Sequence, residues 1–187
     1  MLGGRALPVG WSEIPTGVSR IADSPFAVSK TPLNLSLYPS STYGTDRFVR
    51  DIRHLNAGLV IDLTMSNRYY SRKRVARDAG VPVRKLRLKG HSVPTRRECR
   101  YFAHVVNVFF RRNPHRTVVV HCTHGINRTG FMICFYLCRH LQWDVETAME
   151  TFANSRAPIQ HSAYRNALIG MFADGRAESI DAAPRQD

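Results

Sequence analysis

The sequence predicts an α/β fold in which a central, mostly parallel sheet is flanked by helices. Short apolar runs rich in β-branched residues alternate along the chain with longer amphipathic segments, an order typical of βα units around a parallel sheet. The chain has 187 residues, 43% of them hydrophobic, which suits a single domain with a buried core. The segment HCTHGINRTG, residues 121–130, lies between two apolar runs, so we expect a strand to pass into a helix there.

Three segments have the pattern of strands. Residues 58–64 (GLVIDLT) form a short apolar run that ends in polar residues, which predicts a buried strand. Residues 83–88 (VRKLRL) alternate apolar and basic side chains, so we expect one face of this strand to be in solvent. Residues 117–121 (TVVVH) form an apolar run bounded by polar residues, which predicts a third strand.

Three further segments have the pattern of helices. Residues 95–112 begin with Thr95 and Glu98 at the spacing of a capping box. Residues 128–141 are apolar on nearly all sides, which predicts a central buried helix. Asp144 precedes an i, i+3, i+4, i+7 apolar stripe, so we expect it to be the N-cap of the next helix.

The ends of the chain differ from its centre. Residues 1–7 have no periodic pattern and predict an irregular arm, whereas residues 174–187 (DGRAESIDAAPRQD) are small and polar and predict a flexible tail. We therefore expect one domain over residues 8–173.

Charge and cysteine content limit the classes of function. The formal net charge is +13, from 27 Lys and Arg against 14 Asp and Glu, which favours RNA, DNA or anionic lipid as partner, or only a basic solvated surface. No stretch approaches the roughly 20 apolar residues of a membrane span, and no secretory signal pattern is present. The four cysteines form no CxxC pair, so we expect no metal site and an intracellular, reducing compartment.

Residues 121–130 carry the chemistry. A tight turn between strand and helix directs backbone amides at one point, and the helix adds its positive N-terminal end. Cys122 lies at the centre of this turn, where such surroundings hold a thiol as thiolate at neutral pH. Arg128 can hold two oxygens of one phosphoryl group, and the Thr129 hydroxyl can stabilise the sulfur as it leaves. The amides that would bind phosphate belong to Thr123, His124, Gly125, Ile126 and Asn127.

This combination predicts a cysteine-dependent phosphatase. The thiolate attacks phosphorus, a cysteinyl-phosphate forms, and water hydrolyses it. Arg128 and the amides neutralise the phosphoryl charge, so no metal or other cofactor is expected. The alternative is a buried cysteine at a strand end beside a surface arginine.

HCTHGINRTG resembles the signature of the cysteine phosphatase superfamily, and in particular the RNA triphosphatase branch of the dual-specificity phosphatases. That branch includes the triphosphatase domain of metazoan capping enzymes, baculovirus RNA phosphatase and the RNA/RNP-complex-interacting phosphatase. Residues 59–70 (LVIDLTMSNRYY), residues 89–94 (KGHSVP) and the run from Phe131 to Arg156 are similar to it as well. The resemblance implies a dual-specificity phosphatase fold.

The absence of a general-acid Asp favours this branch. Protein-directed relatives carry a general-acid Asp about thirty residues before the cysteine, whereas residues 89–92 here are KGHS. An RNA 5′-diphosphate leaves without a proton because a phosphate has a second pKa near 6, so the acid is dispensable for a phosphoanhydride. His91 either replaces the acid or only shapes the loop.

Several basic residues are candidates for outer phosphate or RNA contacts. They are Arg68, Lys89, Arg156 and His161, the last at a position where the relatives have Arg or Lys. A basic run over residues 68–89, beside Tyr69 and Tyr70, is a further candidate for RNA contact, although paired tyrosines more often pack. Asp62 either orients a basic group of the site or satisfies amides at a strand end.

The sequence and the resemblance together predict a metal-independent RNA 5′-triphosphatase that removes the γ-phosphate, and they leave removal of the β-phosphate open. The alternatives are a protein or phosphoinositide phosphatase and a catalytically idle phosphate- or RNA-binding module. Expected partners are the RNA 5′ end and a separate guanylyltransferase or RNP proteins. We expect a monomer without membrane contact, in the nucleus in preference to the cytoplasm.

Overall fold

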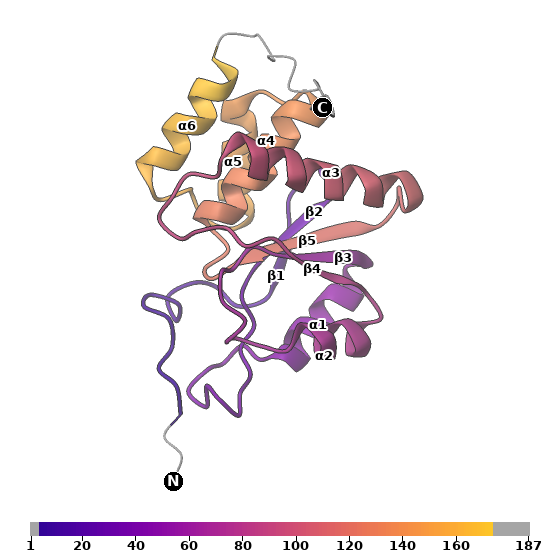
Figure 1. Cartoon of the computed structure of the whole chain (residues 1–187), viewed down its shortest axis with the longest axis vertical. Helices are drawn as coiled ribbons and strands as arrows, with labels where there is room; N and C mark the ends of the chain where they lie inside the picture. Colours follow the sequence, from indigo (N-terminus) through magenta and orange to yellow (C-terminus); the bar gives the residue numbers. More distant parts are fainter. Residues whose placement is uncertain (1–3, 174–187) are drawn as a thin grey trace, which may run out of the picture.

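The computed structural model describes residues 4–173, which form a five-stranded sheet between two layers of helices (Figure 1). The predicted tail, residues 174–187, lies outside the described residues. In chain order the elements are β1 (Val18–Arg20), β2 (Phe26–Lys30), α1 (Thr45–His54), β3 (Ala57–Asp62), α2 (Arg72–Ala79), β4 (Val83–Lys85), α3 (Arg96–Arg112), β5 (Thr117–Cys122), α4 (Asn127–Leu141), α5 (Val145–Ser155) and α6 (Ser162–Phe172).

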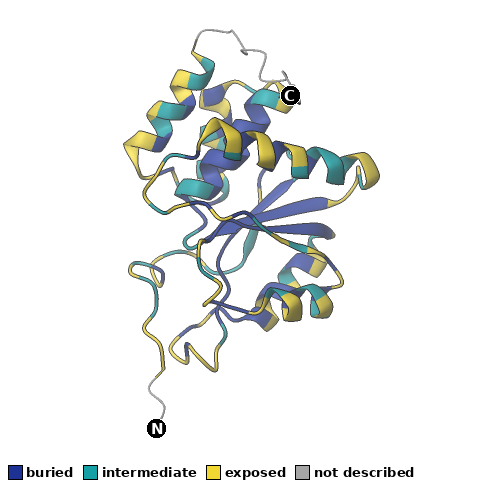
Figure 2. Cartoon of the chain, viewed as in Figure 1, coloured by how far each residue is buried: buried dark blue, intermediate teal, exposed yellow. Residues whose placement is uncertain are grey.

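The strand order is β1-β2-β5-β3-β4, with β5 at the centre. Only the β1–β2 pair is antiparallel, and the other three pairs are parallel. The predicted α/β class and the mostly parallel sheet are therefore confirmed. Every residue of β2, β3 and β5 is buried, and Figure 2 shows these strands as a buried layer between helices whose outer faces are exposed.

The helices cover both faces of the sheet. Helices α1 and α2 lie on one face, and α3, α4, α5 and α6 lie on the other (Figure 1). Each face has its own apolar cluster, centred on Phe48 and Val75 under the smaller layer and on Phe102, Phe131 and Phe152 under the larger one. Ten residues of α4 from Thr129 to Cys138 are buried, which confirms the prediction of a central buried helix.

Most predicted boundaries hold to within one or two residues. Thr95 caps α3 with the complete capping box, and the Asp144 side chain accepts the N–H of Thr147 at the start of α5. The strand predicted for residues 83–88 ends at Lys85, because its partner β3 ends at Asp62. Beyond that point only two backbone bonds continue the pairing, from Leu86 to Asp62 and from Leu88 to Leu63.

Residues 4–16 contain no helix or strand but are tied to the domain. The Arg5 N–H donates to the Leu37 carbonyl at 2.7 Å, and Trp11 is 1% exposed within the smaller apolar cluster. Within the described residues, no helix is long and apolar enough to cross a bilayer.

Candidate active site

Strand β5 ends at Cys122 and helix α4 begins at Asn127, so residues 122–127 form the tight turn predicted between them. The Cys122 side chain is 3% exposed, and its sulfur accepts the N–H of Gly125 at 3.3 Å. Gly125 has φ +71°, a conformation that a side chain disfavours. The turn therefore curls around the sulfur, with the N-terminus of α4 beside it.

The surroundings of Cys122 favour the thiolate. Burial alone would raise the pKa of this thiol, but the Arg128 guanidinium, the Thr129 hydroxyl and the amides of Gly125 and Thr129 outweigh it, so the pKa is lowered. Among the described residues, the buried Thr129 hydroxyl makes no hydrogen bond of normal geometry. Burial raises the pKa of Cys99 and of Cys138 to about 12.

The Arg128 side chain joins the turn to the loops that follow β3 and β4. One terminal nitrogen donates to the carbonyls of Leu63 (3.3 Å) and Leu88 (3.0 Å), and the other donates to the Thr123 hydroxyl (3.2 Å). These bonds fix the plane of the guanidinium beside the turn. Arg128 and Cys122 line the same cavity.

Two further contacts brace the turn from outside. The Asn127 side-chain oxygen accepts the N–H groups of Gln160 and His161, at 2.8 and 3.0 Å. The Tyr164 hydroxyl donates to the Ser92 carbonyl at 2.8 Å. The Asn127 bonds attach the loop before α6 to the turn, and the Tyr164 bond attaches helix α6 to the loop at residues 89–94.

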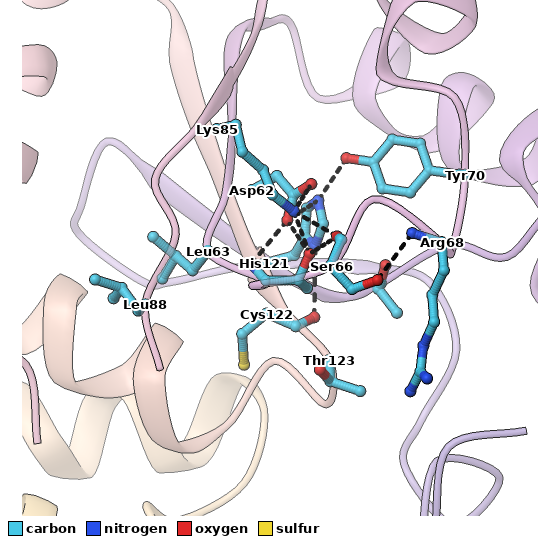
Figure 3. Close-up of polar contacts among 12 residues, drawn as sticks. Asp62, Leu63, Ser66, Arg68, Tyr70, Lys85, Leu88, His121, Cys122 and Thr123 are labelled. Atoms are coloured by element: carbon cyan, nitrogen blue, oxygen red, sulfur yellow. Dashed lines mark hydrogen bonds and ion pairs between the residues drawn. The ribbon is translucent and has the colours of Figure 1, made fainter. Parts of the chain in front are cut away.

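Asp62 belongs to a buried polar cluster on the other side of β5, away from the Cys122 sulfur (Figure 3). Its carboxylate pairs with the Lys85 ammonium at 2.9 Å and accepts the N–H and hydroxyl of Thr64. Burial works to raise the pKa of Asp62, but His121 and Lys85 outweigh it and keep the pKa lowered. The structural role is the one observed, since Asp62 accepts a strand-end amide, whereas the ammonium that it binds, Lys85, does not line the cavity at Cys122.

His121 completes this cluster. Burial lowers the pKa of His121, so the ring is neutral at pH 7. Its Nδ1 lies 3.4 Å from the Cys122 carbonyl, which can only accept, so Nδ1 carries the proton. Its Nε2 then accepts from the Tyr70 hydroxyl at 2.8 Å. Tyr69 and Tyr70 are 6% and 7% exposed, so they pack and are not free to stack on a base.

The Cys122 centre opens into a cavity of about 780 Å³. Arg68 and His161 line it, as do Gly90 and His91 from the loop at residues 89–94. Lys89 and Arg156 are not among the lining residues, so the structure brings together two of the four outer candidates. Within residues 4–173, no three Cys, His, Asp or Glu side chains converge as metal ligands would.

Arg156 points inward instead. It is 9% exposed, and none of its guanidinium nitrogens has a hydrogen-bond partner among the described residues. Burial lowers its pKa, against the opposing charges of Tyr43 and Cys122. Its position differs from the outer contact expected of it: Arg156 is a buried positive charge near the sulfur.

Sequence patterns missed a second buried cation, Lys30. It ends β2 in register with Cys122 on β5 and has no solvent exposure. Burial and, secondarily, the Arg156 charge lower its pKa to about 8. The signal that could have found it is a lysine at the end of the apolar run FAVSK, where a strand interior would otherwise continue.

The fold and this centre define a cysteine-dependent phosphatase. Residues 43–172 match the family model described as "Dual specificity phosphatase, catalytic domain". The chain belongs to this family and is a phosphatase of the dual-specificity class.

The relatives support the branch expected from the sequence. The chain is 38% identical over 129 residues to the mRNA-capping enzyme of Danio rerio, covering 68% of this chain and 21% of that protein. It is 37% identical over 144 residues to the human RNA/RNP complex-1-interacting phosphatase, covering 72% and 43%. It is 32% identical over 152 residues to a tyrosine-protein phosphatase of Autographa californica nuclear polyhedrosis virus, covering 80% and 90%. The chain thus spans about a fifth of the capping enzyme and less than half of the human relative.

Solved structures share the fold at low identity. The crystal structure of Tk-PTP in the active form has a TM-score of 0.64 and 14% identity, covering 82% of this chain and 94% of that one. This likeness confirms the predicted dual-specificity phosphatase fold.

Proposed function

We propose that this phosphatase removes the γ-phosphate from 5′-triphosphorylated RNA. The observation that carries the proposal is the shape and lining of the cavity above Cys122. Its volume of about 780 Å³ is several times that of one phosphoryl group. The loop that faces the sulfur, residues 89–94, has the sequence KGHSVP and contributes no carboxylate.

The absence of a carboxylate from the loop at residues 89–94 limits which leaving groups the site can expel. A seryl or tyrosyl oxygen needs a proton as it leaves, and a general acid in that role is typically worth about 10² to 10⁴ in rate. The RNA 5′-diphosphate that leaves in the proposed reaction is stable as an anion at neutral pH. The site is therefore better suited to a phosphoanhydride than to a phosphoprotein.

The reaction runs in two steps. The Cys122 thiolate attacks the γ-phosphorus, and the bond to the β–γ bridging oxygen breaks, so the RNA diphosphate departs with that oxygen and its electron pair. Arg128 and the amides of the turn hold the equatorial oxygens during transfer. Water then attacks the cysteinyl-phosphate, inorganic phosphate leaves, and the Thr129 hydroxyl stabilises the returning thiolate. These groups supply the charge neutralisation, so the reaction proceeds without a metal ion.

The relatives and the charge support RNA as substrate. Two of the relatives are named for mRNA capping and for interaction with an RNA/RNP complex, and the net charge of +13 attracts a polyanion. The proposed partners are the RNA 5′ end and a separate guanylyltransferase or RNP proteins, in the nucleus in preference to the cytoplasm.

The test is phosphate release from RNA labelled at either the γ- or the β-phosphate, with EDTA present. We expect release of γ-label by the wild type and none by Cys122→Ser, and the β-label reports whether a second phosphate is removed. A phosphotyrosine peptide is the comparison substrate. A requirement for magnesium, activity in Cys122→Ser, or preference for the peptide would each refute the proposal.

A further inference from the structure

The N-terminal segment forms one wall of the active-site cavity. Pro8, Val9, Gly10, Glu13 and Ile14 all line it, although none belongs to a helix or strand. On the sequence alone this segment was only the start of the domain, beside an irregular arm. In the structure it faces the same space as the Cys122 sulfur.

The wall is attached to β2, which pairs with the strand that carries Cys122, and to the turn after Cys122. The Lys30 ammonium donates to the carbonyls of Trp11 (2.9 Å) and Ile14 (2.6 Å) and lies 3.6 Å from the centroid of the Trp11 ring. The His124 Nε2 donates to the Val9 carbonyl at 2.8 Å. Lys30 is the register partner of Cys122, and His124 belongs to the phosphate-binding turn. The wall is therefore positioned relative to the sulfur by direct contacts.

The side chains that the wall presents do not suit phosphate. Val9 is 95% exposed. Glu13 is exposed and has no hydrogen bond or ion pair among the described residues, and it is the one carboxylate that lines the cavity. A carboxylate repels phosphoryl oxygens, so the ligand group beside it must be a hydrogen-bond donor.

The wall of the cavity formed by the loop after β3 also presents an apolar side chain. Met65, 55% exposed, and Arg68, whose guanidinium carbon lies 5.1 Å from the centroid of the Tyr69 ring, line the cavity from the loop after β3. An apolar group from each wall and a free carboxylate provide the chemistry that holds a nucleoside, whose base is flat and apolar on its faces and whose ribose hydroxyls donate.

We propose that residues 8–14 contact the first nucleoside of the RNA 5′ end, with Val9 against the base and Glu13 accepting a hydrogen bond from a ribose hydroxyl. Lys30 is the positioning residue of this wall. The inference rests on the proposed function and deepens it, because it assigns the part of the substrate beyond the phosphates.

The test compares two substrates that differ in the nucleoside. Triphosphorylated RNA has one, and inorganic tripolyphosphate has none. Glu13→Gln replaces a charge-assisted hydrogen bond by a weaker neutral one, and Val9→Ser removes an apolar contact. For each we expect the ratio of kcat/KM values, RNA over tripolyphosphate, to fall about five- to tenfold. The change appears mainly in KM for RNA. The control Glu150→Gln, an exposed carboxylate on α5, leaves the ratio at the wild-type value.

Lys30→Met tests the positioning role through the same ratio, with urea unfolding as the check that the variant is folded. If it does not fold, Glu13→Gln and Val9→Ser still decide the proposal. An unchanged ratio in both of these variants would overturn the nucleoside wall. An equal loss on both substrates in Glu13→Gln, with loss of one limb of the pH–rate profile, would overturn it in favour of proton donation by Glu13. Neither outcome refutes the proposed function, which is tested separately by release of γ-label from triphosphorylated RNA by the wild type.

Discussion

Gly125 lies so close to Ser29 that an added Cβ would be 2.2 Å from the Ser29 carbonyl oxygen. The phosphate-binding turn therefore packs directly on the backbone at the end of β2. Gly125 is required there for two reasons, its φ of +71° and this close approach.

Comparing a substitution of Gly125 with one of a control glycine distinguishes the effect of the positive φ from the effect of close packing. We expect Gly125→Ala to lower the free energy of unfolding by about 3 kcal/mol or more, from backbone strain plus overpacking, and to abolish phosphate release. The matched control is Gly80→Ala at the end of α2, where φ is +70° but no atom lies within 4 Å of the added Cβ. Its expected cost is only about 1 kcal/mol. Equal urea midpoints for the two variants would contradict the packing argument.

Alkylation by iodoacetamide reports the ionisation of Cys122. The reagent reacts with thiolate, so the rate rises with pH through the thiol pKa. Because the Cys122 pKa is lowered from 9.0 and that of the other three cysteines is raised, we expect selective modification with a midpoint below pH 9. Arg128→Met should move this midpoint upward, since it removes a positive charge that lowers the Cys122 pKa.

The control for that experiment is Arg97→Met, which removes an exposed charge on α3 and should leave the midpoint in place. Modification that spreads evenly over the four cysteines would argue against a thiolate at Cys122.

The Asp62–Lys85 pair should contribute strongly to stability. Both side chains are nearly fully buried, and removal of one partner from such a pair costs about 3 to 5 kcal/mol. We expect this cost for Asp62→Asn in urea unfolding at pH 7. Asp46→Asn removes an exposed partner of Arg74 and should cost at most about 1 kcal/mol.

The sign of the pH dependence follows from the Asp62 pKa. It is lowered on folding, so its contribution to stability is present above the unfolded value of 3.8 and is lost as the pH falls through the folded value. The difference between wild type and Asp62→Asn should therefore shrink only below about pH 4. A difference that already shrinks near pH 6 would assign the effect to another group.

We expect the buried Arg156 guanidinium to lower the free energy of unfolding while it places a positive charge near the Cys122 sulfur. This guanidinium is buried without a hydrogen-bond partner among the described residues, and replacement of an unpaired buried charge by an apolar side chain removes its desolvation cost. We expect Arg156→Met to unfold at a higher urea concentration than wild type. We also expect it to raise the alkylation midpoint of Cys122, because the two charges interact.

The urea unfolding midpoint and the alkylation midpoint of Cys122 are both needed to test the role of Arg156. Higher stability together with an unchanged midpoint would remove this residue from the active site. Lower stability would show that the buried guanidinium has a partner in solution.

The phosphate-binding turn was predictable because it is contiguous. Residues 121–130 contain Cys122, Arg128 and the start of α4, so local pattern alone predicts the passage from strand to helix that brings them together. The prediction for Arg156 differed from the structure because the direction of a side chain after a helix depends on tertiary packing. Lys30 was missed because its place depends on the register of β2 against β5, which no local pattern encodes. Glu13 was missed because its segment is held by the contacts of Lys30 with Trp11 and Ile14, which are distant in sequence.

Helices α1 and α2 were not predicted, because their local sequence pattern does not reveal them. At least half of the residues in each of their sequences, TDRFVRDIRH and RKRVARDA, are charged, and the few apolar residues of each pack on the sheet. The basic run at residues 68–89 thus includes a helix in which Arg74 pairs with Asp46 and Asp78. Part of the charge that suggested RNA contact is neutralised within the protein.

The central position of β5 also has a consequence for biosynthesis. It is the last of the five strands to leave the ribosome, yet it pairs with both β2 and β3. Until then the inner edges of β2 and β3 have no partner, and such unpaired apolar edges promote aggregation. The nascent chain therefore passes through a vulnerable interval, and the nucleophile at the end of β5 appears in the same event that closes the sheet.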